Sequence, residues 1–318
     1  MAYSQGGLIA ATDYNGFVGT ATTSGTINYV WSTGNGQYGY GQTALTQAAS
    51  SAGLITATQW ATMINTLNSI SEHQSGGSGT GITAPTAGNQ INYLSTLSTN
   101  IATINTNHNS ANTQGSIVSG SGVAASAITA TNNTTYGPTV FQTRTVTFSS
   151  GDAARYFFNA GGSINLVVTG VTNGDSTSRS TDAVNVIGTY FGGMSAFKGT
   201  SNGQRTGTGG TLTGTYTSGY WGLTTSYQTI AQVTTSSSTY SGDYVLLQAK
   251  TNGTQGSNGD NGTVISFALT YYSAHTSTTS ALYGGSGDTL NLTPTTRIDY
   301  YPPETTNLTS TWGTPTIA

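Results

Sequence analysis

Residues 140–168 constrain the fold more than any other stretch, because three regular elements follow one another there without a break. The stretch opens with alternating polar and apolar side chains (TVTF), which is typical of a half-buried strand. Ser150 or Asp152 can cap a short helix over residues 153–158, and a Gly-Gly pair ends that helix. Residues 164–168 predict the next strand. The stretch therefore predicts a strand–helix–strand unit that begins a β domain, and it contains no group that indicates chemistry.

The C-terminal part, residues 139–318, predicts a mainly β domain. Short apolar runs separated by Gly, Asn and Ser clusters are typical of an antiparallel β-sandwich or a jelly-roll-like domain. The Asn-Gly turn within residues 257–262 predicts a type I′ hairpin between the runs on either side of it. Residues 300–318 are expected to be extended and either exposed or docked on a partner. The predicted strands cover residues 140–148, 163–171, 183–191, 211–217, 226–234, 243–250, 263–272 and 289–292.

The N-terminal part, residues 1–108, predicts a helical and extended region that serves assembly. Residues 57–73 form one amphipathic helix, with Thr56 and Gln59 placed for a capping box. A second helix has apolar side chains at the 3-4 spacing of heptads, so it is either the partner of the first in a helical hairpin or a short parallel trimeric coiled coil. The two stripes comprise Trp60, Met63, Ile64, Leu67 and Ile70, and Leu94, Leu97, Ile101, Ile104 and His108.

Two further N-terminal features concern repeats and linkers. Residues 8–14 (LIAATDY) and 54–60 (LITATQW) share the pattern L-I-x-A-T-x-aromatic, which is either a duplicated helix start with a Thr cap or a chance repeat. Residues 75–88 are rich in Gly and Ser and predict a flexible loop. Residues 109–138 are small and aperiodic, which predicts a linker or an extended arm that packs on a neighbouring subunit.

Composition excludes several classes of function. Charged residues make up 5% of the chain, the net charge is -3, and the seven basic residues are scattered, so no phosphate-binding face is expected and nucleic acid is not a predicted partner. The chain has no cysteine and hence no disulfide framework. No apolar run is long enough to span a membrane, and the first residues lack the pattern of a signal peptide. We therefore expect a protein made and kept in a cytoplasm.

Candidate catalytic and metal-binding groups are few. A glycosidase needs two carboxylates close together, but most acids here adjoin Gly, Ser or Asn, as turn residues do. The histidines are isolated, although His108 at a heptad position could form a ring in a trimer. Residues 258–262 superficially resemble a Ca²⁺ loop but lack its acids, so a turn is preferred. The acids are Asp13, Glu72, Asp152, Asp175, Asp182, Asp243, Asp260, Asp288, Asp299 and Glu304, and the other histidines are His73 and His275.

Clustered tyrosines provide a possible binding surface. Residues 216–227, which include Trp221, and the pairs Tyr271-Tyr272 and Tyr300-Tyr301 could stack on the apolar faces of sugars. The alternative, which we favour, places these aromatic side chains along strands or in subunit interfaces.

Residues 140–162, 222–232 and 243–272, together with the segments LIAATDYN and TATQWATMINTLNSI, resemble virion structural proteins of tailed bacteriophages. The likeness is greatest to tail-associated or particle-surface proteins of phages that infect aquatic bacteria. The resemblance implies a non-enzymatic, multimeric virion component assembled in the host cytoplasm. It carries over no catalytic, cofactor-binding or metal-binding residue, and no cofactor is predicted.

The leading hypothesis is accordingly a tail or fibre-type homo-oligomer that contacts other virion proteins and a host surface glycan. A capsid decoration or head-fibre protein differs only in its place on the particle. A glycan-degrading tailspike would be an enzyme, and a secreted adhesin or filament subunit conflicts with the missing signal peptide.

Overall fold

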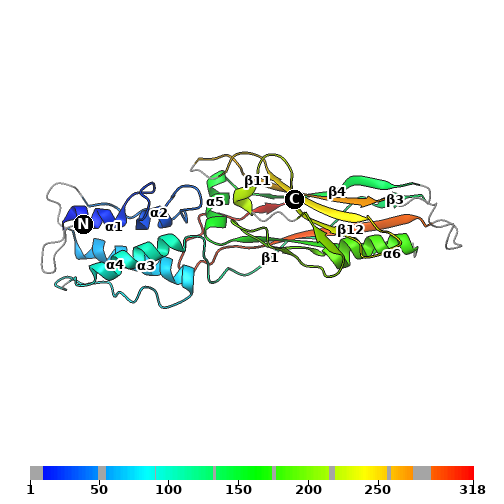
Figure 1. The fold of residues 1–318 in the computed structure, drawn as a ribbon. Coiled ribbons are helices and arrows are strands. Elements are labelled where there is room, and N and C mark those ends of the chain that lie inside the picture. Colours follow the sequence, from blue (N-terminus) through cyan, green and yellow to red (C-terminus); the bar gives the residue numbers. More distant parts are fainter. Residues whose placement is uncertain are drawn as a thin grey trace.

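The computed structural model describes residues 10–48, 55–89, 91–131, 134–173, 177–214, 219–255, 259–274 and 288–318. The molecule is elongated, with four helices at one end and two antiparallel sheets filling the rest (Figure 1). The helices are α1 (Ala11–Val18), α2 (Ile27–Trp31), α3 (Ala57–Ser75) and α4 (Leu94–Thr106).

The two sheets confirm a mainly β architecture. Phe197 of one sheet and Phe267 of the other meet edge to face with ring centroids 5.6 Å apart, so the inner faces pack on each other at this point. The first sheet contains β1 (Val118–Ser119), β2 (Val123–Ala124) and β3 (Ile128–Ala130), each paired with β12 (Leu290–Tyr301), then β5 (Ser163–Thr172), β6 (Gly193–Phe197) and β7 (Gln204–Arg205). The second has the order β13 (Thr316–Ile317), β4 (Tyr136–Thr147), β11 (Val264–Ser273), β10 (Tyr244–Thr251), β9 (Gln228–Thr234) and β8 (Thr211–Thr213).

The strand–helix–strand unit forms as predicted, as β4, α5 (Gly151–Asn159) and β5. Ser150 is the N-cap of α5, because its hydroxyl accepts a hydrogen bond from the Ala153 backbone N–H at 3.0 Å. Phe157 and Phe158 on this helix are buried, and Phe158 stacks on Tyr220 with ring centroids 4.4 Å apart. The helix therefore closes the end of the two sheets that faces the helical part of the chain (Figure 1).

The predicted strand at residues 183–191 is wrong. The chain is helical there, as α6 (Ser178–Val184) followed by a single π-helical segment, η1 (Asn185–Phe191). The β-branched residues suggested a strand, but the buried side chains recur at helical spacing and Thr177 caps the helix. The buried set is Ala183, Val186, Ile187 and Phe191.

Other predicted strands match closely or differ in length. β4, β5, β9, β10 and β11 fall where expected, whereas residues 289–292 are only the beginning of the longer β12, whose Pro294 concealed its continuation. β6 and β7 were not predicted. Residues 215–217 of the predicted strand 211–217 lie outside the described residues, and β8 covers its first part.

The β10–β11 hairpin is confirmed, but its type I′ turn is not. β10 ends at Thr251 and β11 begins at Val264, a connection far longer than two residues, and residues 256–258 lie outside the described residues. The Asn252 side chain holds the base of the connection, since its Oδ1 accepts hydrogen bonds from the backbone N–H groups of Thr263 and Val264 at 2.8 and 2.9 Å.

The predicted helices at 57–73 and from residue 94 onward both form. The buried stripe of α4 packs on α2 and α3 of its own chain, which agrees with the helical hairpin rather than with a coiled coil between chains. His108 lies beyond the end of α4 and stacks on Tyr38, with ring centroids 3.7 Å apart. Thr56 and Gln59 form the predicted capping box.

The repeated motif marks two helix starts, because α1 and α3 begin at equivalent positions of the two copies. The shared Thr12 and Thr58 are not the caps, since the N-cap positions are Ala10 and Thr56. Leu8, Ile9 and Leu54 lie outside the described residues. The aromatic residues that close the two motifs, Tyr14 and Trp60, pack together with ring centroids 6.0 Å apart.

Residues 114–130 and the C-terminal tail both lie on their own chain. The first segment follows β12 through a bridge at Gln114 and the three short strands β1–β3. In the tail, Leu308 and Trp312 are buried and β13 pairs with β4, so the expectation of an exposed or partner-docked tail is wrong for these residues.

Candidate functional site

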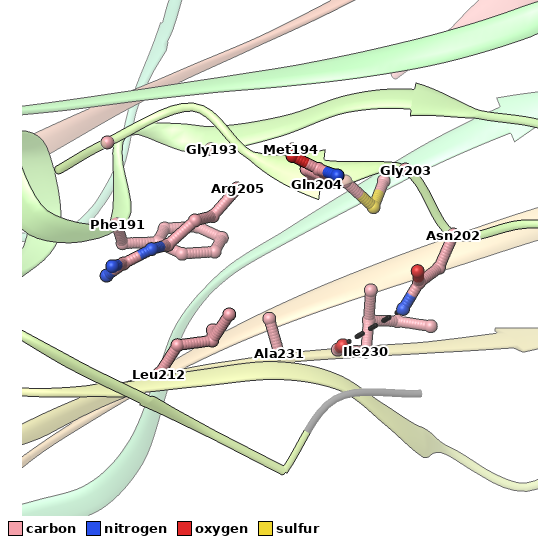
Figure 2. Close-up of a pocket in the computed structure, with 11 residues that line it drawn as sticks. Phe191, Gly193, Met194, Asn202, Gly203, Gln204, Arg205, Leu212, Ile230 and Ala231 are labelled. Atoms are coloured by element: carbon pink, nitrogen blue, oxygen red, sulfur yellow. Dashed lines mark hydrogen bonds between the residues drawn. The ribbon is translucent and has the colours of Figure 1, made fainter. Parts of the chain in front are cut away.

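A pocket of about 370 Å³ lies between the edges of the two sheets. One side is the β6–β7 hairpin and the end of η1, and the other is β8 and β9 (Figure 2). The lining residues are Phe191, Gly193, Met194, Asn202, Gly203, Gln204, Arg205, Gly207, Leu212, Ile230 and Ala231.

Glycines allow the chain to form this wall. Gly193 has φ +121° and a Cβ there would lie 1.9 Å from the Leu166 carbonyl oxygen, while Gly203 has φ +68° and a Cβ would lie 1.5 Å from the Ser195 carbonyl oxygen. At either distance a Cβ would overlap with a backbone oxygen, so neither position can carry a side chain without movement of the backbone. The close approach of β6 to β5 and of β7 to β6 therefore depends on these two residues.

The pocket has an apolar floor and a polar rim. Phe191, Met194 and Ile230 are buried, whereas Arg205 is half-buried and Gln204 is exposed. Arg205 Nη1 donates hydrogen bonds to the carbonyl oxygens of Tyr190 and Gly209 at 3.1 and 2.7 Å, which fixes the guanidinium at the rim.

The described lining combines apolar side chains with amide groups and one guanidinium. Among these described residues none is a Ser, Thr, Tyr, His, Lys, Asp or Glu. Asn202 Nδ2 donates to the Ile230 carbonyl oxygen at 3.2 Å and so ties the two walls together (Figure 2). A ligand with an apolar body and an acceptor or anionic group would match these walls.

Three described tyrosines of the predicted clusters are too deeply buried to stack on a sugar. Tyr220, Tyr271 and Tyr300 are all buried, and burial raises the pKa of each phenol. Tyr271 and Tyr300 lie along β11 and β12, which agrees with the alternative interpretation, whereas Trp221, Tyr272 and Tyr301 are half-buried. Tyr227 is 38% exposed, with Lys250 Nζ 4.6 Å from its ring centroid. Tyr216 lies outside the described residues.

Most of the described acids take part in structural hydrogen bonds, and the pKa of the Tyr271 phenol is raised by burial and further by two of them, Asp182 and Asp243. Asp13 accepts a hydrogen bond from the Ala10 backbone N–H at the start of α1, and Asp152 forms an ion pair with Arg155 on α5. Asp299 forms an ion pair with Arg297 at 2.9 Å. Asp175 lies outside the described residues. Deeper in the protein, Asp182 accepts a hydrogen bond from Thr235, Asp243 from Tyr271, Asp288 from Tyr240, and Glu304 from His73.

A buried His73–Glu304 pair joins α3 to the C-terminal tail. His73 Nδ1 lies 2.9 Å from Glu304 Oε1, and both residues are buried. Burial lowers the pKa of His73, although Glu304 opposes this effect. Burial alone would raise the pKa of Glu304, but hydrogen bonds from Asn307, His73 and Thr306 outweigh it, so the pKa is lowered. The pair therefore holds a neutral imidazole that donates to an ionised carboxylate.

The next two findings concern metal binding and membrane-spanning helices. Among the described residues, no group of three or more His, Asp or Glu side chains is arranged to hold a metal ion, and His275 lies outside them. Within the same part of the chain, none of the helices has the length and apolar character that crossing a membrane requires.

Comparison of the chain with protein-family models, with curated proteins and with solved structures finds no match. Sequence reasoning missed the pocket because β6 and β7 were not predicted and because residues 183–191, which supply Phe191, were assigned to a strand. The closely spaced glycines at 192–193, 203, 207 and 209–210 were the available signal.

Proposed function

We propose that this chain is a structural protein of a bacteriophage virion, a multimeric tail or fibre-type component that contacts other virion proteins and a host surface. The observation that carries the proposal is the scarcity of surface charge. The chain has seven basic and ten acidic residues, and seven of these are buried: Arg144, Arg155, Arg179, Asp182, Asp243, Asp299 and Glu304.

A nearly uncharged surface favours association with copies of itself. Charge repulsion is one force that keeps proteins apart in solution, and burying charges in an interface costs desolvation energy. Because this surface carries few charges, both the repulsion between copies and the cost of burying charges in an interface are small. Its Ser, Thr, Asn and Gln side chains can form hydrogen bonds across an interface without that cost.

The β1–β2 edge of the first sheet is the part of the surface best suited to such contacts. β1 and β2 pair with β12 on one side only, and their Val118 and Val123 side chains are 41% and 39% exposed. Ile117, beside them, is 44% exposed. Unpaired strand edges with apolar side chains are natural positions for another chain.

The first experiment is the mass of the purified full-length protein at micromolar concentration by light scattering. We expect a stable homo-oligomer. Val118→Lys and Val123→Lys should shift the mass toward monomer, whereas Val171→Lys should not, because Val171 lies on the face of β5 within the sheet. A monomeric wild-type protein would contradict the proposal.

The second experiment is immunogold labelling of virions from the source phage. Label on the tail or its appendages supports the proposed role, and label over the head favours a capsid decoration or head-fibre protein instead. Absence of label on all particles would contradict both structural roles. The enzymatic alternative, a glycan-degrading tailspike, requires release of reducing ends from host glycans, which the same preparation can test.

A further inference from the structure

Arg144 is a buried cation between the two sheets. It lies on β4, where the ladder places it opposite Phe267 of β11, and its neighbours on the same face are Gln142, opposite Leu269, and Val146, opposite Ile265. Those three partners on β11 are core residues with at most 1% of their surface exposed. Because paired residues share a face of a sheet, Arg144 and Gln142 point inward, and Arg144 is 3% exposed.

Arg144 differs from the other buried arginines of this protein. Arg155 is held by Asp152 and by the Tyr38 carbonyl oxygen, and Arg179 by Ser273 and the carbonyl oxygens of Thr131 and Thr134. In the described part of the chain, by contrast, the Arg144 side chain has no hydrogen-bond or ion-pair partner; its Nε is buried, whereas its two Nη groups are not fully shielded from solvent. Gln142 Oε1 on the same face is also buried without a partner.

A buried guanidinium without a counter-charge is energetically unfavourable. It remains charged in proteins and carries five N–H donors in a planar fork. Burial lowers the pKa of Arg144, and no neighbouring acid opposes that effect. The Nε–H has lost its hydration without gaining an acceptor, and the Nη groups remain within reach of a ligand from solution. The group that matches this fork best is an anion with one or two oxygens, or a halide.

We propose that Arg144, with Gln142 beside it, binds a small anion at the inner face of β4: a carboxylate or a halide. The Gln142 amide can turn its NH₂ group toward the anion, since oxygen and nitrogen of the amide are interchangeable in this position. The anion comes either from solution or from a carboxylate side chain of a second copy, and the chemistry at Arg144 is the same in both cases.

The test begins with crystals of the full-length wild-type protein grown in bromide. An anomalous peak within hydrogen-bonding distance of the Arg144 guanidinium is the expected result for a free anion. A carboxylate of a neighbouring subunit at the same position supports the second source. Ordered water alone at Arg144 overturns the proposal, and this outcome does not depend on whether any variant folds.

Thermal unfolding in increasing formate or bromide provides the matched measurement in solution. For a free anion, the melting temperature of the wild type and of Arg297→Met should rise with concentration, and that of Arg144→Met should not. Arg297 is a suitable control because its side chain is 44% exposed and paired with Asp299. If the anion is instead a carboxylate of a second copy, added formate or bromide should leave the melting temperature unchanged. In that case Arg144→Met should have a lower mass by light scattering than the wild type, because the contact between copies is weakened. If Arg144→Met matches the wild type in both measurements, the proposal is wrong.

Discussion

At the scale of single residues, the fold depends on positions where only one side chain is compatible with the backbone. Gly193 is the clearest of these, because it links η1 to β6, lines the pocket and lies against the Leu166 carbonyl oxygen of β5. Asn252 acts through its side chain instead, since its Oδ1 accepts two backbone hydrogen bonds at the base of the β10–β11 connection. Both residue types predict a turn in the sequence, but neither indicates which strand lies beside it.

Gly193→Ala should destabilise the protein by about 3 kcal/mol or more, since steric overlap with backbone is added to the strain of a positive φ. Gly242→Ala is the matched control: its φ is +98° and nothing lies within 4 Å of its Cβ. Only the conformational cost remains there, about 1–2 kcal/mol. Chemical denaturation of both variants measures the difference. Equal losses would show that β5 and β6 can separate without cost.

At the scale of elements, α5 connects the helical end of the molecule to the sheets. Asn159 on this helix is fully buried, and its Nδ2 donates to the carbonyl oxygens of Gly36, Tyr38 and Gly39 at 3.2, 3.0 and 3.1 Å. Arg155, one turn earlier, donates to the same Tyr38 oxygen at 2.9 Å. Two side chains of α5 therefore hold the loop after α2, in addition to the stacking of His108 on Tyr38.

Asn159→Asp should cost about 3–5 kcal/mol, because it replaces a donor by a buried carboxylate that faces three carbonyl oxygens. Asn252→Asp retains its two acceptor bonds and should change the stability little. Thermal unfolding reports the total loss, and amide hydrogen exchange at residues 34–42 reports whether it is local. Unchanged exchange in that loop would contradict the assigned role of Asn159.

At the scale of the whole molecule, the His73–Glu304 pair makes the contact between α3 and the tail sensitive to acid. Both pKa values are lowered in the folded state. The unfolded chain therefore binds more protons than the folded one as the pH falls through the ordinary pKa of His, about 6.5, and then that of Glu, about 4.3. Stability from both groups is present at neutral pH and is lost on acidification.

We expect the melting temperature to fall between pH 7 and pH 5 and to fall further below pH 4.5. His73→Gln can still donate a hydrogen bond to Glu304 but does not titrate, so the decline between pH 7 and pH 5 should become shallower in this variant. His108→Gln is the comparison variant: burial lowers the pKa of His108 as well, but its Nδ1 lies 2.7 Å from the Asn105 carbonyl oxygen and not beside a carboxylate, so this variant reports the effect of a buried histidine without the tail contact. Parallel profiles for wild type and His73→Gln would contradict this account.

The sequence by itself determined the local elements. The Ser150 and Thr56 caps, the apolar stripes of α3 and α4, and the alternation in β4 and β10 all depend on residues within a few positions of one another. Short-range rules of this kind act before any tertiary contact forms. They also place Arg144 on the same face as Val146, because a strand repeats every two residues.

Only the tertiary structure decided the rest, because it depends on which distant segments come together. The helical α6–η1 segment packs on β5 and β12, and that packing overrode the strand preference of its β-branched residues. Tyr220, Tyr271 and Tyr300 became core side chains, and seven of the few charges became buried, through contacts between segments that lie far apart in the chain. The pocket has walls from both sheets, so no contiguous stretch of sequence encodes it. The alternation within β4 predicts which way the Arg144 side chain points. It does not predict whether a distant segment places a counter-charge beside it.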